Sequence, residues 1–216
     1  MTIAAFLGDR PDLFIRQRKE LVEILVDWEM GNQYVVLDDQ GNELGSVVEK
    51  KGGFWSFFRR GFLRSHRPLE VAVMDRSGSR VLTLTRSFFF LFSSLDVTGP
   101  DGRKVGQVER RFGVLYKKYD LLDETGIAFA RVASPRWRLW TFPVEGADGA
   151  RTATISKKWG GVLREVFSDA DTYRVEFGTS TWTETQRALI FAAAISIDFD
   201  FFENNQGSGG LIGWGD

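Results

Sequence analysis

The chain has 216 residues, of which 43% are hydrophobic and 26% are charged, and its formal net charge is −1. This length and apolar content predict one main globular domain. The balanced charge excludes a global attraction to nucleic acid or to anionic lipid, so any such attraction must be local, and we expect no nucleic-acid partner. The chain has no cysteine and a single histidine, His66, which excludes disulfides, thiolate metal sites and multi-histidine zinc sites.

The beginning of the chain predicts a cytoplasmic protein. Residues 1–9 lack a basic start and are too short in apolar length to resemble a signal peptide. We expect residues 1–12 to be an N-terminal extension and residues 13–204 to form the domain. Residues 205–216 have the composition of a flexible tail.

A repeated turn signal organises the middle of the chain. An acidic residue is followed by glycine, which supplies the positive φ that a tight turn needs, and runs rich in β-branched and aromatic residues flank each signal. The signals lie at residues 38–41, 75–78, 99–102, 123–126 and 145–149. The predicted strands cover residues 14–27, 33–38, 43–50, 69–75, 80–86, 94–98, 104–110, 114–121, 127–133, 137–145, 150–157 and 173–178.

One long apolar helix is predicted over residues 182–203, after a short helix over 160–167. Two pairs before it have the spacing of a capping box, Thr181 with Glu184 and Thr183 with Gln186. A helix that is apolar on every face must lie in a core or in lipid. A membrane span needs about 20 apolar residues. Because Asp198 and Asp200 interrupt the apolar run, the sequence favours a core helix over a membrane span.

Many antiparallel strands followed by one apolar helix favour a mainly β fold. A closed antiparallel barrel around the helix removes the edges of the sheet and buries every face of the helix at once.

Residues 157–171 resemble the signature of the phospholipid scramblase family, and residues 13–23, 28–34 and 197–203 are similar to its first strand, first turn and last helix. The signature positions are Lys158, Trp159, Leu163, Arg164, Glu165 and Phe167. The resemblance covers residues 13–204 and implies a tubby-like fold, a twelve-stranded antiparallel barrel around a hydrophobic C-terminal helix. It also implies binding of membrane phospholipids and calcium-stimulated, bidirectional phospholipid scrambling.

The resemblance implies one cofactor, calcium, in a twelve-residue segment that maps to residues 169–180. Asp169 and Asp171 stand at its first and third positions, and Tyr173, Phe177 and Ser180 at its fifth, ninth and twelfth. Calcium requires six to eight oxygen ligands, preferably with a bidentate carboxylate, and Ser180 stands where the family has a carboxylate, so this segment departs from the family pattern. The alternative is that Asp169 caps the short helix and Asp171 begins a turn.

Two aromatic segments are the predicted membrane contacts. Residues 50–67 combine aromatic side chains with basic ones that attract anionic headgroups. Residues 87–94 are the second segment, for which a barrel strand with two buried faces is the alternative. The predicted lipid-binding residues are Phe54, Trp55, Phe57, Phe58, Arg59, Arg60, Phe89 and Phe90. A protein partner is an alternative occupant of residues 50–67.

Basic and aromatic residues also mix at 110–119, at Arg131 and at 136–138. Such a mixture binds a lipid phosphate or stacks on single-stranded nucleic acid, and the alternative is a solvated sheet face with its aromatic side chains turned inward.

Taken together, these features predict a scramblase-family protein that binds phospholipids without covalent catalysis, peripherally on the inner face of the plasma membrane. The alternative function is a cytoplasmic adaptor that holds a protein partner on the barrel face or on residues 50–67.

Overall fold

The computed structural model describes residues 2–17, 30–50, 69–86, 93–111, 113, 116–135, 137, 140–149, 152–157, 172–178 and 181–201. These residues form twelve strands and two helices. The helices are α1 (Ile3–Leu7) and α2 (Glu184–Phe201). The strands are β1 (Asp12–Gln17), β2 (Met30–Leu37), β3 (Glu43–Lys50), β4 (Leu69–Asp75), β5 (Arg80–Arg86), β6 (Ser93–Thr98), β7 (Lys104–Arg111), β8 (Tyr116–Asp123), β9 (Ala128–Pro135), β10 (Thr141–Gly146), β11 (Thr152–Ser156) and β12 (Thr172–Glu176).

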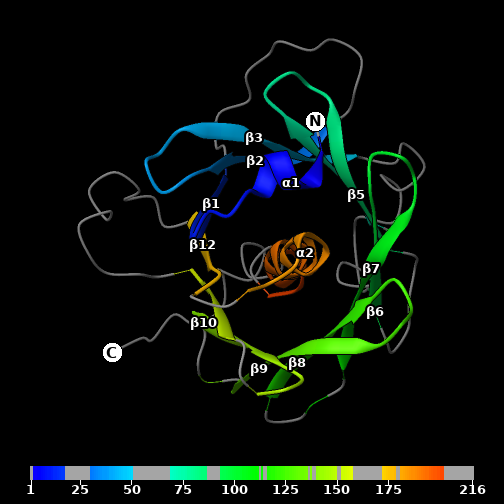
Figure 1. Ribbon diagram of the computed structural model, residues 1–216. Coiled ribbons are helices and arrows are strands. Elements are labelled where there is room, and N and C mark those ends of the chain that lie inside the picture. The colour runs from blue at the N-terminus through cyan, green and yellow to red at the C-terminus, as the bar shows by residue number, and fades with distance from the viewer. Residues whose placement is uncertain are drawn as a thin grey trace, which may run out of the picture.

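The twelve strands close into one antiparallel barrel in which each strand pairs with its neighbours in the sequence (Figure 1). The barrel is closed by β1, which pairs with both β2 and β12. Each of the described strands therefore has two partners, and the sheet that they form has no edge. The structure confirms the predicted fold, a mainly β barrel around a hydrophobic C-terminal helix.

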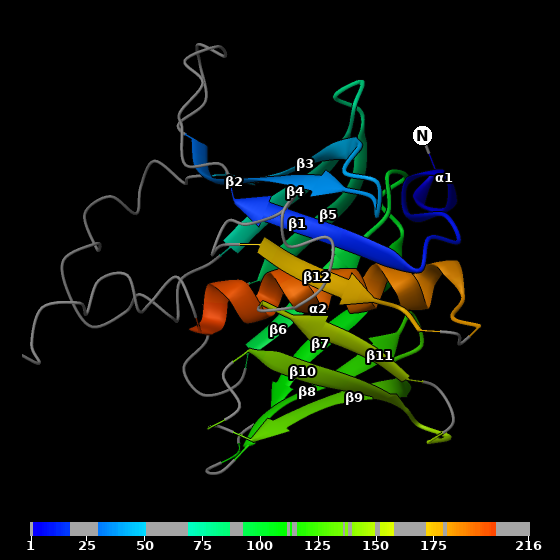
Figure 2. The ribbon, with the colours of Figure 1, turned by 90° about the vertical axis from the view of Figure 1, so that its left-hand side faces the viewer.

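The two ends of the barrel differ in the connections they carry. Because neighbouring strands are antiparallel, connections alternate between the ends. What we call the turn end carries the short turns that follow β2, β4, β6, β8 and β10. What we call the distal end is formed by the last residues of β1, β3, β5, β7, β9 and β11 and the first residues of the strands that follow them. Figure 2 shows α2 running from the turn end to the distal end.

The acidic turn signals of the sequence form the turn end. The Asp75 carboxylate accepts hydrogen bonds from the backbone N–H groups of Ser77 (2.8 Å) and Ser79 (2.9 Å). Gly78 takes a φ of +78° in the same turn, a conformation that glycine adopts without steric cost. The turn at Asp123 repeats this pattern, with Gly126 at a φ of +84°. The hairpins predicted at these turns are confirmed.

The helix α2 lies along the barrel axis (Figure 1). Its first turn is closed by a capping box in which the Thr183 N–H donates to Gln186 Oε1 (3.0 Å) and the Gln186 N–H donates to Thr183 Oγ1 (3.3 Å). Residues 188–194 are at most 1% exposed. The side chains on every face of this segment therefore pack inside the barrel, as their composition predicts.

The short helix α1 packs against α2 at the turn end. The Phe6 ring meets the Phe191 ring edge to face, with centroids 6.4 Å apart, and the Ala4 N–H donates to the Glu184 carboxylate (2.6 Å). Gly45 makes room for this contact, because a Cβ at that position would lie 2.9 Å from the Phe6 ring and 2.0 Å from the Met74 carbonyl oxygen. Residues of the expected N-terminal extension thus contribute to the core.

Two predicted strands differ from the observed ones. The strand predicted over 14–27 is described only as β1, which ends at Gln17, because residues 18–29 lie outside the described residues. The strand predicted over 137–145 begins at Thr141, and Trp137 lies in a turn before it. The pairing explains this boundary, since the ladder between β10 and β11 starts at Thr141↔Ser156.

Candidate functional site

The side chains predicted as sites lie outside the described residues. These are the lipid-binding residues Phe54, Trp55, Phe57, Phe58, Arg59, Arg60, Phe89 and Phe90, the calcium candidates Asp169 and Asp171, and the signature residues Lys158, Trp159, Leu163, Arg164, Glu165 and Phe167. The described residues that flank these segments are Lys50 and Leu69, Arg86 and Ser93, and Lys157 and Thr172. Five of them are strand ends and Lys157 directly follows the end of β11, so all six lie at the distal end of the barrel.

The last turns of α2 carry two buried carboxylates into this end of the barrel. Asp198 accepts hydrogen bonds from the phenol groups of Tyr34 in β2 (2.5 Å) and Tyr173 in β12 (2.6 Å). The Lys157 ammonium lies 5.2 Å from the centre of the Tyr173 ring. Two phenol donors compensate the burial of the carboxylate and tie α2 to the first and last strands of the barrel.

Asp200 is held from the other side of the barrel. Its carboxylate pairs with the Arg86 guanidinium of β5 at 2.8 Å and accepts a hydrogen bond from the Tyr119 phenol of β8 at 2.9 Å. The Asp200 side chain is 0% exposed and that of Arg86 is 3% exposed, so water does not screen this ion pair. Burial, and next the negative charge of Asp200, raise the pKa of Tyr119 well above its usual value, which keeps the phenol protonated as a donor.

The two aspartates bind α2 to different parts of the barrel wall. Successive residues of an α-helix are rotated by about 100°, so carboxylates two positions apart point to nearly opposite sides. Asp198 reaches β2 and β12, whereas Asp200 reaches β5 and β8. Asp198 and Asp200 interrupt the apolar run in the sequence, and in the structure each carboxylate has hydrogen-bond or ion-pair partners on strands of the barrel. The arrangement fastens the end of the helix inside the barrel.

The interior of the barrel becomes polar toward the distal end. Glu49 of β3 is 3% exposed and Lys117 of β8 is 8% exposed. The Lys117 ammonium lies 5.1 Å from the centre of the Phe142 ring, a cation–π contact. Arg110 of β7 approaches Asp200 to 4.0 Å with 32% of its side chain exposed. Charged groups of both signs are therefore buried or half-buried at the distal end, and Arg110 approaches the end of α2.

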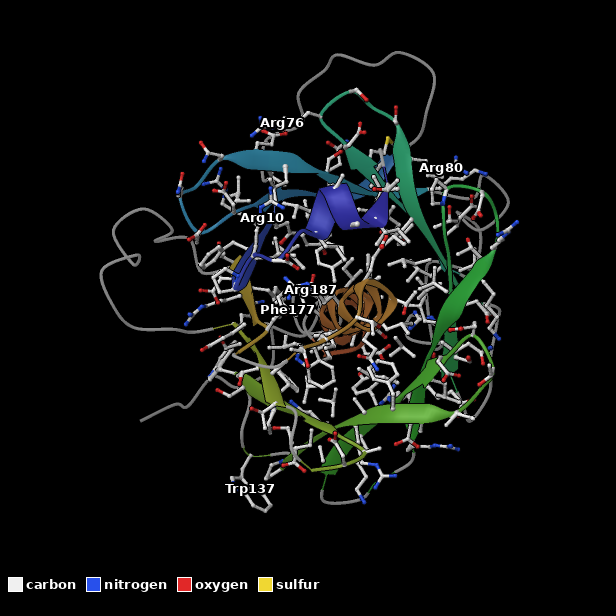
Figure 3. The ribbon with its side chains drawn as sticks, viewed as in Figure 1. Arg10, Arg76, Arg80, Trp137, Phe177 and Arg187 are labelled. Atoms are coloured by element: carbon white, nitrogen blue, oxygen red, sulfur yellow. The ribbon has the colours of Figure 1, made fainter. Side chains whose placement is uncertain are left out.

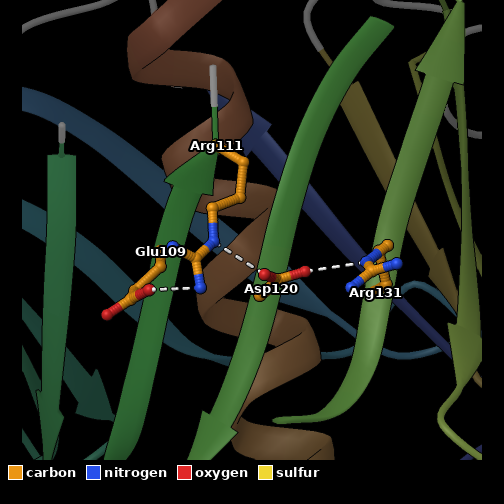
Figure 4. A network of polar contacts seen from close by, with 4 residues as sticks. All are labelled: Glu109, Arg111, Asp120 and Arg131. Atoms are coloured by element: carbon orange, nitrogen blue, oxygen red, sulfur yellow. Dashed lines mark hydrogen bonds and ion pairs between the residues drawn. The ribbon is translucent and has the colours of Figure 1, made fainter. Parts of the chain in front are cut away.

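An ion-pair network occupies the outer face of β7, β8 and β9 (Figure 4). Asp120 pairs with Arg111 at 2.7 Å and with Arg131 at 2.8 Å, and Arg111 also pairs with Glu109 at 3.1 Å. Burial of Asp120 alone would raise its pKa, but the hydrogen bonds from Arg131 and Arg111 outweigh burial and hold the pKa below its usual value. The structure therefore favours the solvated sheet face over a lipid-phosphate cradle for Arg111 and Arg131.

The turn end carries a surface cleft of about 590 Å³. Its lining residues are Arg10, Asp38, Asn42, Leu44, Asp75, Arg76 and Ser77. The Asp38 and Asp75 carboxylates accept hydrogen bonds within their own turns. Arg187 contacts one of the lining residues, because its guanidinium donates to the Arg10 carbonyl, and the same guanidinium lies 3.7 Å from the centre of the Phe177 ring (Figure 3). Burial lowers the pKa of Arg187.

The described part of the predicted calcium segment is residues 172–178. Tyr173 and Phe177 are both buried there, with the Tyr173 phenol directed to Asp198 and the Phe177 ring under Arg187. Among the described residues no group of three or more His, Cys, Asp or Glu side chains is placed to hold a metal ion.

Comparison with known proteins identifies the class to which this barrel belongs. A family model described as Scramblase matches residues 2–204, so the chain belongs to the Scramblase family. The prediction made from the signature at 157–171 is thereby confirmed. Within the described residues, no helix combines the length and the apolar character that a membrane crossing requires.

The chain is also similar to three named relatives and to one solved structure. The chain is 28% identical to Altered inheritance rate of mitochondria protein 25 of Saccharomyces cerevisiae over 99% of its length, which is 77% of that protein. It is 26% identical to mouse Phospholipid scramblase 1, over 92% of this chain and 63% of that one. Bovine Phospholipid scramblase 2 is 25% identical, over 94% and 72%. An X-ray structure of an Arabidopsis thaliana protein is 16% identical, with 91% and 93% coverage and a TM-score of 0.48.

Proposed function

We propose that this protein binds membrane phospholipids at the distal end of its barrel and promotes their bidirectional movement between bilayer leaflets, without covalent chemistry. The observation that carries the proposal is the family match over residues 2–204, together with relatives named phospholipid scramblases at about one quarter identity. The distal position of the strand ends that flank residues 51–68 and 87–92 adds support from the fold.

The proposed mechanism uses the aromatic and basic residues of 50–67. Aromatic side chains partition into the interface of a bilayer, and each basic residue near an anionic surface contributes about 1 kcal/mol of attraction. Phe54, Trp55, Phe57 and Phe58 supply the apolar area, and Arg59 and Arg60 supply the charge. A protein seated in the headgroup layer disturbs lipid packing locally, which lowers the barrier for a headgroup to cross. No bond of the lipid is made or broken.

Liposome flotation tests the binding step. The unmodified protein is mixed with phosphatidylserine-containing vesicles, with and without calcium, beside a variant that carries Phe54→Ser, Trp55→Ser, Phe57→Ser and Phe58→Ser. We expect the unmodified protein to float and the variant to remain in the dense fraction. The matched control is Ile127→Ser, which removes a side chain that is 66% exposed at the turn end and should leave flotation unchanged.

A fluorescent-lipid assay tests the scrambling step on the same proteins. Dithionite quenches the fluorescent lipid of the outer leaflet alone, so reconstituted protein that scrambles lipids raises the quenched fraction above half. The same assay is repeated with calcium for the unmodified protein and for the double variant Asp169→Asn with Asp171→Asn. A calcium response that only the unmodified protein shows would support calcium binding at these two aspartates. If the protein fails to float with any vesicle, the proposed function is wrong, and a search for a protein partner becomes the next step.

A further inference from the structure

Among the residues that the structure describes, the accessible charged side chains at the two ends of the barrel are mainly of opposite sign. Among the described residues of the turn end, the solvent-accessible charged ones are mainly acidic: Asp9, Asp38, Asp39, Glu43, Asp101, Asp123, Glu124, Glu145, Asp148, Glu176 and Glu184, against Arg10, Arg76, Arg80, Arg103 and Lys104. At the distal end the described accessible ones are mainly basic: Arg16, Lys50, Arg110, Arg111, Lys118 and Lys157, against Glu70 and Glu109. The buried Asp198 and Asp200 at the distal end are covered by their phenol and guanidinium partners.

An exposed aromatic side chain lies at the basic end. Trp137 is 71% exposed and stands between the last residue of β9, Pro135, and the first residue of β10, Thr141 (Figure 3). Tryptophan prefers the boundary between lipid headgroups and acyl chains, because its ring is apolar and its indole N–H is polar. The sequence predicts that Trp137 lies in a strand. In the structure Trp137 lies in a turn, and its side chain is exposed to solvent.

The length of the barrel makes this charge separation effective. A strand of eight residues is about 26 Å long, and the usual strand tilt reduces its height along the barrel axis to about 20 Å. The Debye length at physiological salt is about 8 Å. When the distal end touches a charged surface, its cations lie within one Debye length, while the acidic turn end lies more than two Debye lengths away and is screened. The net charge of −1 for the whole chain therefore does not oppose such docking.

From these observations we infer that the protein docks end-on on an anionic phospholipid bilayer, with the barrel axis pointing into the membrane, Trp137 in the headgroup layer and the turn end facing away. The partner is a lipid surface of negative charge, because the described accessible cations of the distal end complement it and the exposed indole side chain of Trp137 lies at the same end of the barrel. This inference rests on the proposed function and adds an orientation and a lipid class to it.

Charge variants at the two ends test the lipid class. Arg16→Gln with Lys118→Gln removes two cations from the distal end, and the matched control Arg80→Gln with Arg103→Gln removes two cations from the turn end, so both variants have the same net charge. Two cations near an anionic surface are expected to change vesicle affinity about 30-fold. We expect that loss for the distal variant at physiological salt, and less than a threefold change for the control. Equal losses for the two variants would overturn the inference.

Site-directed fluorescence tests the orientation, and the cysteine-free chain makes it direct, since each variant carries one thiol. Trp137→Cys at the distal end and Ile127→Cys at the turn end are labelled with an environment-sensitive dye, and each is added to phosphatidylserine vesicles whose flotation is measured in parallel. We expect the dye at position 137 to brighten and shift to the blue, and the dye at 127 to keep its spectrum. If the protein floats but the dye at position 127 changes its spectrum, or the dye at position 137 does not, the inferred orientation is wrong while the proposed function stands. The absence of flotation by the unmodified protein would overturn the proposed function and the inference with it.

Discussion

The replacement Asp200→Ala tests how firmly α2 is fastened inside the barrel. The Asp200 side chain is fully buried, and its carboxylate forms an ion pair with the Arg86 guanidinium and accepts a hydrogen bond from the Tyr119 phenol. The variant removes the Asp200 carboxylate from the Arg86 guanidinium, whose side chain is 3% exposed. Arg110, with 32% of its side chain exposed, can turn toward water when Asp200 is lost, whereas Arg86 cannot.

The size of the effect follows from the burial. Removing one member of a buried ion pair costs about 3–5 kcal/mol, because the remaining charge has lost both water and its counterion. The loss of an acceptor for a buried phenol adds a smaller amount, of about 1 kcal/mol. We expect Asp200→Ala to lower the free energy of unfolding by about 4 kcal/mol, which for a chain of this length lowers Tm by about 8–16 °C.

Urea denaturation followed by circular dichroism measures this loss. The matched control is Asp39→Ala, which removes an exposed aspartate of the turn end and should change the free energy of unfolding by less than about 0.5 kcal/mol. The triple variant Arg86→Met, Tyr119→Phe and Asp200→Leu replaces the charged set by apolar groups and should recover most of the stability. A loss below about 1 kcal/mol for Asp200→Ala would refute the argument that this ion pair fastens the helix.

Three further predictions concern the same barrel. Tyr34→Phe removes one donor to Asp198 and should cost about 1–3 kcal/mol in urea denaturation, while the circular dichroism spectrum of the folded protein stays unchanged. Gly45→Ala places a Cβ against the Met74 carbonyl and the Phe6 ring and should lower Tm, with a cost of about 1–3 kcal/mol; an unchanged Tm would contradict the tight packing of α1. The pKa of Asp120 is lower in the folded state than in the unfolded state. The ionised carboxylate therefore stabilises the fold above the unfolded pKa of about 3.9, and this contribution is lost as pH falls through the folded pKa. We expect the free energy of unfolding of Asp120→Asn to fall less steeply below about pH 4 than that of the unmodified protein.

The local elements of this fold could be predicted from the sequence because their signals are local. Acidic residues and glycine mark the turns, and the hydrogen bonds of Asp75 and Asp123 show why those residues stand there. The capping box at Thr183 and the apolar run after it mark α2. The barrel then follows, because a helix that is apolar on all faces requires a wall all around it.

The partners of the buried charges could not be predicted in the same way. Asp200 pairs with Arg86, which lies 114 positions earlier in the chain, and Asp198 with Tyr34, which lies 164 positions earlier. Such pairs depend on the register of the whole barrel, which no local pattern specifies. The turn at Trp137 escaped prediction for a related reason, since alternating basic and apolar residues resemble a strand and only the ladder with β11 shows where β10 begins.

Flotation of the unmodified protein with phosphatidylserine vesicles, beside the variant with serine at 54, 55, 57 and 58, tests the central claim most directly. We predict that the unmodified protein moves to the top of the gradient and that the variant stays at the bottom while it keeps the circular dichroism spectrum and Tm of the folded barrel. Flotation of both proteins would contradict the assignment of the membrane contact to residues 50–67. Failure of both, with a folded barrel, would contradict phospholipid binding itself.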